Sequence, residues 1–512
     1  MILRDQVSGR NLVFSPKDYL TFYSITKGNA MSRAASSTAH QQIATWLDEQ
    51  IPSMMAQCKL PGFSMAMVHN GAICYADGFG ARDAQRNLPA TADTLYGIGS
   101  VTKSFVALGI LQLAAAGKLD LHDPVSQHIP FALGLPDAPI TIHHLLTHSL
   151  GLPNLATSTM LIGKGLGLES GIPLSSPNDF YRFVNGAQAE IVAKPGERFF
   201  YHNAGYRMLG HIIQATSGLP FHEYLQQKVI APLGMPRTTF AVAAMRADPD
   251  HAVFHRKTAT GANEPAPFPY PSPVDNPAFS FLSAAGGLFS SVNELAKYVQ
   301  MHLELGQSQT PPLLSQAAFA QMHTAHMPRP AQNPMPGGTF AQQGYGYGLA
   351  ITPNFLGHKL VAHDGSVVVS TASLAFMPEL NAGVVMMGNG AGMPYATIAQ
   401  SVFAILLGKE PAAVIPALQI ESRMAQLTGT YATYRGIETI KVVNKGGLLY
   451  AEATDPITTA TTLTPLIPED PTLASTRFYT MSNGVKSPVE FWVDEQGDTR
   501  LIIERYGYRK VG

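Results

Sequence analysis

The strand and helix patterns of this chain are unevenly distributed, and their distribution constrains the fold more than any single residue does. Two strands are expected early, over 63–69 and 72–78, joined by Asn70-Gly71, a strong signal for a two-residue hairpin turn. Strand patterns return late, over 348–352, 358–363, 370–377 and 383–388. A mostly helical block separates the two sets. We therefore predict an α/β fold in which one mixed sheet, flanked by helices, is closed by both ends of this region.

The composition changes beyond this region. Residues 408–420 are expected to form a linker, and short alternating strands separated by Gly and Asp turns follow it. Such a series of strands is typical of a small β-barrel or sandwich. A Pro-, Gln- and Gly-rich segment over 310–346 is expected to be a long surface loop. The predicted domains are an extension over 1–37, an α/β domain over 38–407, the linker, and a barrel over 421–512.

Charge and cysteine content argue against several classes of protein. The 512 residues carry a net charge of −1, only 13% are charged, and no basic stripe suggests nucleic acid. Cys58 and Cys74 are the only cysteines, which favours free thiols over a disulfide scaffold. The N-terminus carries charges where a signal peptide needs an apolar core, and no apolar run reaches the ~18 residues of a membrane span. We expect a cytoplasmic protein with no nucleic-acid or membrane partner.

The pattern with the most chemical content is Ser100-Val-Thr-Lys103, which opens a long apolar run expected to be a helix. Residues i and i+3 share one face of a helix, so the lysine amine would lie beside the serine hydroxyl. A serine alcohol needs a neighbour that accepts its proton before it acts as a nucleophile. A lysine amine can do so when burial lowers its pKa, and the apolar helix start would bury it. Ser100 is therefore the candidate nucleophile, and Lys103 its candidate base.

The spacing alone does not identify the nucleophile, because Ser24-Ile-Thr-Lys27 repeats it. Small and polar residues without apolar periodicity follow this other copy. An N-terminal turn explains Ser24 better than catalysis does, since no helix would bury Lys27.

Two further patterns support Ser100. Tyr201 and Asn203 lie two positions apart before a helix-like run, and His-Asp-Gly over 363–365 ends an expected strand. In the order Ser-x-x-Lys, Tyr-x-Asn, His-x-Gly, these patterns resemble those of the class C β-lactamase-like serine hydrolases. That family includes penicillin-binding proteins, D-aminopeptidases and family VIII esterases. The chain is also similar to the family over 93–105, 117–124, 140–153 and 285–290.

The resemblance covers about residues 40–407 and implies a β-lactamase-like fold, in which a mixed sheet flanked by helices is joined by an all-helical subdomain. The C-terminal strands resemble, through 427–431, the lipocalin-like barrel that follows this domain in some members. Ser100 would then form an acyl-enzyme. Lys103 and Tyr201 would share its proton, with the lysine cation lowering the tyrosine pKa. Backbone N–H groups of Ser100 and Ser366 would form the oxyanion hole.

The resemblance assigns further roles to the opposite side of the site. Asn203 would hydrogen-bond to Lys103 and to the substrate, and His363 would line the wall and relay a proton to the leaving group. Gly365, which has no Cβ, would let the substrate lie close to its strand. The β-lactamases of the family usually carry Lys-Thr-Gly over 363–365, where this chain has a group titrating near pH 6.5 in place of a permanent charge. β-Lactam hydrolysis is therefore expected to be minor at most.

Other patterns have simpler explanations. Ser149 lies in a sequence that imitates a nucleophile elbow, but no strand precedes it, so we expect a helix end there. His143, His144 and His148 suggest zinc, but a glutamate of the usual motif and a further carboxylate are missing, so packing and helix capping are expected. The glycine-rich stretch 344–348 lacks the Lys-Ser/Thr that would hold a phosphate.

These observations predict a serine hydrolase without metal or cofactor, acting through an acyl-enzyme on small carboxylic esters or amides, including D-amino-acid peptides. Its partner would be that small ester, amide or peptide substrate, and the barrel could supply a contact for a homo-oligomer. Two alternatives stay open: an acyltransferase that uses the same site, and a sensor that is acylated without turnover.

Overall fold

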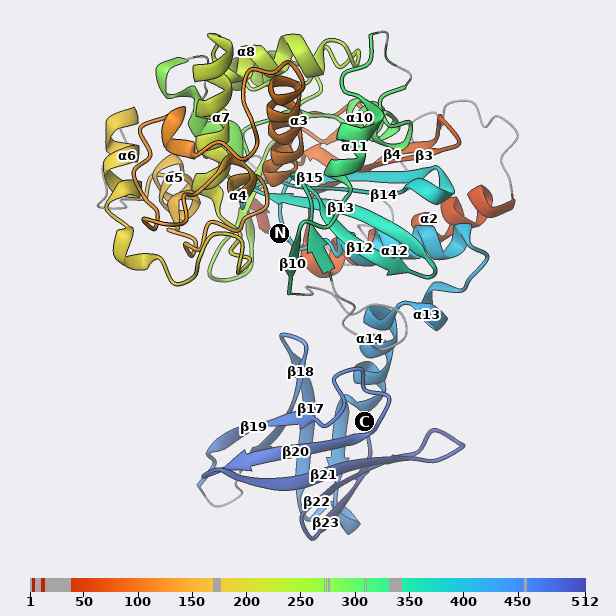
Figure 1. The fold of residues 1–512 in the computed structure, drawn as a ribbon. Coiled ribbons are helices and arrows are strands. Elements are labelled where there is room, and N and C mark those ends of the chain that lie inside the picture. The colour runs from red at the N-terminus through yellow and green to blue at the C-terminus, as the bar shows by residue number, and fades with distance from the viewer. Residues whose placement is uncertain are drawn as a thin grey trace. The chain divides into compact units, whose positions relative to one another are not determined.

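The computed structural model describes residues 2–4, 11–13, 38–168, 176–270, 272, 274, 277–307, 309, 311–330, 343–454 and 458–512. The chain divides into two compact units, unit 1 (Met1–Ala331 and Ala341–Leu406) and unit 2 (Gln332–Phe340 and Leu407–Gly512), both drawn in Figure 1. Of the predicted extension over 1–37, the structure describes only the paired strands β1 (Ile2–Arg4) and β2 (Asn11–Val13). Ser24 and Lys27 lie outside the described residues.

Unit 1 is built on a nine-stranded sheet with the order β10-β11-β12-β13-β14-β15-β3-β4-β5. Its strands are β3 (Gly62–His69), β4 (Ala72–Asp83), β5 (Leu88–Pro89), β10 (Met327–Arg329), β11 (Gln343–Tyr345), β12 (Ala350–Phe355), β13 (His358–Ser366), β14 (Thr371–Met377) and β15 (Ala382–Gly388). The late strand β15 pairs with the early strand β3, which confirms the predicted closure by both ends. The α/β fold class is confirmed, although all described pairs in this sheet are antiparallel, so the sheet is not mixed.

The turn between β3 and β4 shows why the strand prediction succeeded. Asn70 and Gly71 have φ angles of +51° and +76°. Two consecutive positive φ angles make the turn whose twist matches a hairpin, and Asn-Gly adopts it at low cost.

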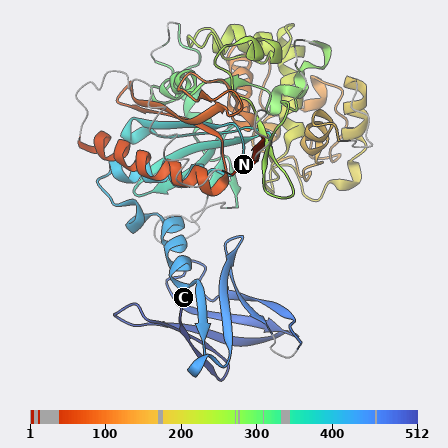
Figure 2. The same ribbon diagram turned by 180° about the vertical axis from the view of Figure 1, so that it is seen from behind.

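Helices surround this sheet and form a separate block beside it (Figures 1 and 2). The helices of unit 1 are α2 (Thr38–Cys58), α3 (Thr102–Ala115), α4 (Ile142–Leu146), α5 (Thr157–Gly165), α6 (Pro177–Asn185), α7 (Asn203–Ser217), α8 (Phe221–Leu225), α9 (Val242–Ala247), α10 (Val292–Leu303), α11 (Gln316–Met322) and α12 (Tyr395–Leu406). Its short 3₁₀ or π turns are η1 (Gly99–Val101), η2 (Val125–Gln127), η3 (Gln188–Glu190), η4 (Gln226–Ile230), η5 (Pro277–Ala285) and η6 (Pro378–Leu380). Two small ladders pair β6 (Tyr96–Gly97) with β9 (Phe289–Ser290) and β7 (His255–Lys257) with β8 (Asn263–Pro265). Seen from behind in Figure 2, α2 crosses one face of the sheet, and α10 packs on the other.

Helix α3 lies in the interior of unit 1. Every residue from Thr102 to Leu111 is buried, because the helix is apolar around its whole circumference and contacts α7, α8 and η5. The prediction of a loop over 310–346 is wrong for the parts that the structure describes, because they contain α11, β10 and β11. Helix-forming residues over 316–322 follow the cap residue Ser315, whose side chain accepts the N–H of Ala318, and this explains α11.

In its described residues, unit 2 contains two α-helices, one short 3₁₀ turn and a closed eight-stranded barrel, which confirms the predicted C-terminal β-barrel. Its elements are α13 (Pro411–Val414), α14 (Pro416–Leu427), η7 (Tyr434–Gly436), β16 (Gly429–Ala432), β17 (Thr439–Lys445), β18 (Leu448–Thr454), β19 (Thr461–Pro468), β20 (Arg477–Ser482), β21 (Val485–Val493), β22 (Thr499–Ile503) and β23 (Tyr506–Lys510). The last strand pairs with the first, so the sheet has no free edge. Helices α13 and α14 occupy much of the stretch predicted as a linker over 408–420. In the described part of the chain, no helix is both long enough and apolar enough to cross a membrane.

Candidate active site

Ser100 stands at a sharp turn of the backbone just before the buried helix α3. It is the middle residue of η1, and its side chain is half-buried. The preceding Gly99 has φ = +51°, and a Cβ built there would lie 2.5 Å from the backbone nitrogen of Ser366. Glycine tolerates both conditions because it has no side chain. The turn that presents Ser100 therefore depends on Gly99.

Lys103 lies one helical turn beyond Ser100, and its side chain is fully buried. Its Nζ donates hydrogen bonds to the Oγ of Ser100 at 3.0 Å and to the carbonyl oxygen of Ala285 at 2.7 Å. Burial, and secondly the positive charge of Arg207, hold the pKa of Lys103 well below its usual range. An amine in this environment loses its proton readily and can then accept one from a serine hydroxyl. The structure thus brings these two sequence-predicted residues together.

The charge that acts on Lys103 comes from a residue that sequence reasoning missed. Arg207 is fully buried in α7. Its guanidinium donates hydrogen bonds to the carbonyl oxygen of Leu282 and to the hydroxyls of Thr157 and Ser158, at 3.1, 2.5 and 2.9 Å. Among the described residues no carboxylate forms an ion pair with it. Its charge is therefore not neutralised locally, and no motif in the sequence signals this.

Tyr201 lies against the same lysine, with Nζ of Lys103 4.9 Å from the centroid of the tyrosine ring. Burial raises the pKa of Tyr201, although a side-chain hydrogen bond with Ser100 acts in the opposite direction. The prediction that Lys103 lowers this pKa is therefore wrong. Desolvation disfavours the charged phenolate and is the largest of the effects on this pKa. At neutral pH Tyr201 is a phenol that carries a proton.

His363 lies on β13 at the wall of the site, with its ring centroid 6.2 Å from that of Tyr201. Its Nδ1–H donates to the carbonyl oxygen of Asp364 at 2.7 Å, so Nε2 accepts the hydroxyl proton of Tyr345 at 2.9 Å. Burial, and then the charge of Lys103, lower the pKa of His363 to about 3. The prediction of a group titrating near pH 6.5 is therefore wrong. His363 is neutral at pH 7, with both ring nitrogens hydrogen-bonded.

Gly365 and Ser366 continue β13 past the turn that holds Ser100. A Cβ at Gly365 would lie 1.9 Å from the carbonyl oxygen of Ile98 and 2.9 Å from the backbone nitrogen of Ser100. The missing side chain therefore makes room for the backbone of the nucleophile turn, whereas we had predicted that it makes room for substrate. This close approach places the backbone of Ser366 beside Gly99, so the two segments predicted to form an oxyanion hole are neighbours.

Asn203 is the first residue of α7 and is half-buried. Its predicted hydrogen bond to Lys103 is not formed: within the described residues, Nζ of Lys103 donates to Ser100 and Ala285. The amide group of Asn203 therefore takes no part in holding Lys103 here.

The simpler explanations of Ser149 and His144 agree with the structure. Ser149 is buried just beyond the end of α4, and its hydroxyl is 2.8 Å from that of Thr147. Nδ1 of His144 accepts the backbone N–H of Thr141 at 3.1 Å, which is the expected helix capping. Over the part of the chain that the structure describes, no group of three or more His, Cys, Asp or Glu residues is placed to hold a metal ion.

Aromatic residues around Tyr201 were missed from the sequence. Tyr206 is fully buried and donates its hydroxyl proton to the carbonyl oxygen of Leu146 at 2.8 Å. Tyr345 holds His363, and it comes from the glycine-rich stretch that we had considered only for nucleotide binding. These tyrosines are distant in sequence from Ser100, and only the alternation of Tyr and Gly over 344–348 could have drawn attention to one of them.

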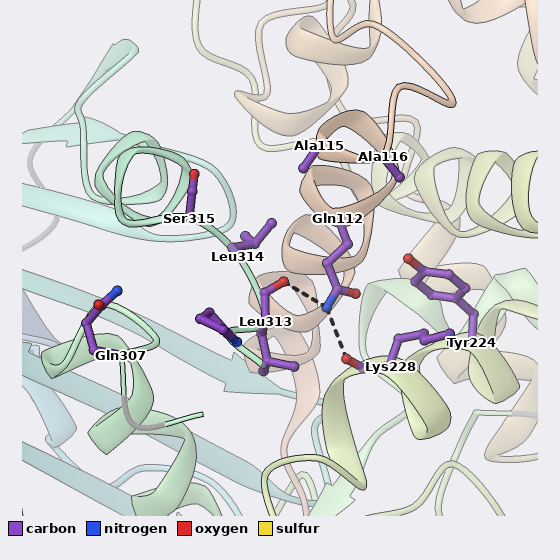
Figure 3. A pocket seen from close by; sticks show the side chains of 10 residues that line it. Gln112, Ala115, Ala116, Tyr224, Lys228, Gln307, Leu313, Leu314 and Ser315 are labelled. Carbon is purple, nitrogen blue, oxygen red and sulfur yellow. Dashed lines mark hydrogen bonds between the residues drawn. The ribbon is translucent and has the colours of Figure 1, made fainter. Parts of the chain in front are cut away.

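The structure also contains a cavity away from this site (Figure 3). It has a volume of about 610 Å³ and is lined by Gln112, Tyr224, Lys228, Leu313 and Ser315, among others. Gln112 crosses it, with Nε2 donating to the carbonyl oxygens of Lys228 and Leu313 at 3.0 and 3.3 Å. Because α3 rises about 1.5 Å per residue, this end of the helix is remote from Ser100. The cavity therefore does not include the candidate site.

Comparisons with known proteins agree with this geometry. The family model described as Beta-lactamase matches residues 47–406, and the model described as Pab87 octamerisation domain matches residues 411–509. The solved structure of the octameric penicillin-binding protein homologue from Pyrococcus abyssi is 37% identical, covers 91% of this chain and all of that chain, and superposes with a TM-score of 0.82.

Two curated proteins are more distant relatives. Protein flp of Staphylococcus aureus (strain MW2) is 27% identical over 362 residues, which is 69% of this chain and 64% of that protein. Esterase EstB of Burkholderia gladioli is 31% identical over 219 residues, which is 42% of this chain and 56% of the esterase. This chain thus spans less than two thirds of the length of either relative.

Proposed function

The chain belongs to the beta-lactamase family, and from this premise we propose that it is a serine hydrolase that forms an acyl-enzyme at Ser100. The observation that carries the proposal is the fully buried amine of Lys103, 3.0 Å from the Oγ of Ser100. We assign this activity to the domain over 38–407. Small carboxylic esters are the first substrates to examine, because EstB, an esterase, is 31% identical over 219 residues. Amides, including those of D-amino-acid peptides, are the second.

In the proposed acylation, Oγ of Ser100 attacks the substrate carbonyl carbon while its proton passes to the amine of Lys103. The new C–O bond leaves a negative charge on the carbonyl oxygen, which the backbone N–H groups of Ser100 and Ser366 stabilise. When this intermediate collapses, the bond to the leaving alcohol or amine breaks. Tyr201 donates its phenolic proton to that group and recovers one from Lys103. Because burial raises its pKa, Tyr201 begins this step with its proton in place.

Deacylation follows the same route with water in place of serine. Water attacks the acyl carbon and gives one proton to Lys103. When the tetrahedral intermediate collapses, the bond between the acyl carbon and Oγ of Ser100 breaks, and Oγ takes a proton from Tyr201, which recovers one from Lys103. His363 is neutral and hydrogen-bonded to Tyr345, so we assign it to the wall of the site and not to proton transfer. A neutral wall at this position also supports the expectation that β-lactam hydrolysis is minor at most.

The experiment that tests this proposal compares the two Ser-x-x-Lys copies. Ser100→Ala should lower hydrolysis of p-nitrophenyl butyrate at least ~10³-fold and abolish labelling by a fluorophosphonate. Ser24→Ala, the matched control, should leave both unchanged. Full activity in the Ser100 variant, or loss in the Ser24 variant, would reject the assignment.

We also propose that the barrel over 421–512 assembles the chain into a homo-oligomer, with eight copies as the first state to test. The match to an octamerisation domain and the 37% identity to an octameric protein support this. Unit 2 also exposes large apolar side chains that a contact between copies would cover: Ile437 is 79% exposed and Trp492 is 55% exposed. Sedimentation of the full 54.9 kDa chain should give a multiple of that mass. Trp492→Glu should reduce this mass, whereas Val192→Glu, 57% exposed in unit 1, should not.

A further inference from the structure

His148 holds both neighbours of Tyr201 in the chain. It lies two residues beyond the end of α4 and is fully buried. Its carbonyl oxygen accepts the backbone N–H of Phe200 at 2.8 Å, and its ring Nδ1 accepts the backbone N–H of His202 at 3.0 Å. These hydrogen bonds hold the backbone N–H groups of the residue before Tyr201 and of the residue after it. His148 therefore holds the backbone on both sides of Tyr201 by hydrogen bonds.

The imidazole ring of His148 also packs directly against the tyrosine. The ring centroids of His148 and Tyr201 are 4.3 Å apart, and those of Tyr206 and Tyr345 lie 5.0 and 4.8 Å from His148. His148 therefore forms the back wall of the pocket that holds the phenol. Its contacts limit the position of the Tyr201 ring as well as that of its backbone.

Simple core packing does not account for a histidine here. Because Nδ1 accepts a hydrogen bond, the neutral ring carries its proton on Nε2, which is buried and has no hydrogen-bond partner among the described residues. An unpartnered buried N–H is unfavourable. The backbone is also in the left-handed region, with φ = +58°. A leucine would fill similar space without the buried N–H, but it could not accept the hydrogen bond from His202.

We propose that His148 is a positioning residue that holds the Tyr201 hydroxyl in place beside Ser100 and Lys103, an inference that rests on the proposed function. Proton transfer depends steeply on distance and direction, so a small displacement of the phenol slows the reaction without changing substrate binding. His148 contacts neither the nucleophile nor the leaving group in this scheme and acts through Tyr201.

Two substitutions at this position separate the hydrogen bond from packing. Asparagine tolerates the left-handed backbone and can place an oxygen near the position of Nδ1, whereas leucine provides volume but no acceptor. His148→Leu should lower kcat for p-nitrophenyl butyrate about 10- to 100-fold, with KM changed less than about threefold. In His148→Asn, the decrease in log kcat should be at most half of the decrease in His148→Leu. Equal losses in both variants, or a loss expressed only in KM, would overturn the proposal.

A double-mutant cycle with Tyr201→Phe tests whether His148 acts through the tyrosine. The rate of fluorophosphonate labelling is the second readout, because it can be followed for hours in slow variants. His148→Leu should slow the wild type but change the Tyr201→Phe variant less than about twofold. Multiplicative losses would mean that His148 acts independently of Tyr201, and the proposal would be rejected.

A control variant and the activity of the wild type keep this test distinct from the test of the proposed function. His302→Leu removes another fully buried histidine of unit 1, whose ring bonds to His323, and it should lower Tm while leaving kcat unchanged. A wild-type protein without Ser100-dependent ester hydrolysis would refute the proposed function itself. Ser100-dependent activity that is insensitive to His148→Leu in a variant with a native Tm would refute only the role of His148.

Discussion

The two compact units of this protein differ in what they bury. Unit 1 buries whole charged or titratable side chains, including Lys103, Arg207 and His148, with none of their surface exposed. In the described part of unit 2, no charged or histidine side chain is buried. The core holds Thr499 and the tyrosines Tyr431 and Tyr508, and it is otherwise formed by apolar residues such as Phe478, Phe491 and Leu501. Burying polar groups costs stability, whereas burying apolar ones provides it. The comparison indicates that unit 1 buries charged and titratable groups at a cost in stability that the core of the barrel largely avoids.

The largest effect should come from removing the buried amine. Lys103→Met should lower ester hydrolysis about 10³- to 10⁴-fold, because Ser100 then has no proton acceptor. The free energy of unfolding of unit 1 should stay constant or rise, because methionine has similar length and no group to desolvate. Steady-state kinetics and urea denaturation measure the two quantities. A Lys103→Met variant that is active but less stable would contradict the conclusion that the buried amine costs stability in unit 1.

Acid should destabilise unit 1 and leave the barrel intact. All 17 histidines lie between residues 40 and 363, and burial lowers the pKa of His202 and His323 to about 4. A histidine with a lowered folded-state pKa keeps its full contribution above pH 6.5 and loses it as the pH falls towards 4. For a shift from 6.5 to about 4, the loss at pH 5 is about 2 kcal/mol for each buried ring.

Circular dichroism during thermal unfolding at pH 7 and pH 5 checks this expectation. The transition of the helical unit 1 should move to lower temperature at pH 5, and a β-type signal from the barrel should persist. A barrel that unfolds first on acidification would contradict it, because unit 2 contains no histidine.

The barrel should respond to a cavity in its core more than to any change of charge. Phe491 is 1% exposed and packs against Tyr431 and Phe478, with ring centroids 5.9 and 5.4 Å away. Phe491→Ala should therefore destabilise unit 2 by about 3–4 kcal/mol. Differential scanning calorimetry would show the barrel transition at lower temperature. At 25 °C and low denaturant, the value of kcat should remain within about twofold of wild type, since the site residues belong to unit 1.

The smallest of these effects concerns the charge of Arg207. Its positive charge lowers the pKa of Lys103, together with the larger effect of burial. Arg207→Met should therefore raise the pKa of Lys103, so that the acid limb of kcat/KM moves to higher pH and activity at pH 7 falls about tenfold. The histidines that act on or near this amine, His148 and His363, are neutral at that pH because their pKa values are lowered. Tyr201 and Tyr206 are neutral as well because burial raises theirs.

Arg207→Lys is the matched variant, because it keeps the charge and loses part of the hydrogen bonding. Its pH profile should resemble that of the wild type more than that of Arg207→Met. An unchanged acid limb in Arg207→Met would show that burial alone sets the pKa of Lys103.

Much of the site was predictable where its geometry is local or matches a family pattern. Ser100 and Lys103 are one helical turn apart, so their spacing places the two side chains together in any helix. Tyr201, His363 and Gly365 were found through the order of three motifs. The sequence did not reveal why a glycine is needed at position 365. The close contact of its strand with Ile98 joins segments more than 260 residues apart.

The sequence by itself determined the fold class, the C-terminal barrel and the pairing of Ser100 with Lys103, since these follow from periodicity, turn residues and spacing along one element. The tertiary structure decided the protonation states and the partners. A neutral His363 and a protonated Tyr201 depend on how much water distant segments exclude. The burial of Arg207 near Lys103 and the contacts of His148 with Tyr201 depend on which distant segments meet. Burial sums contacts over the whole fold, and no local pattern of residues records that sum.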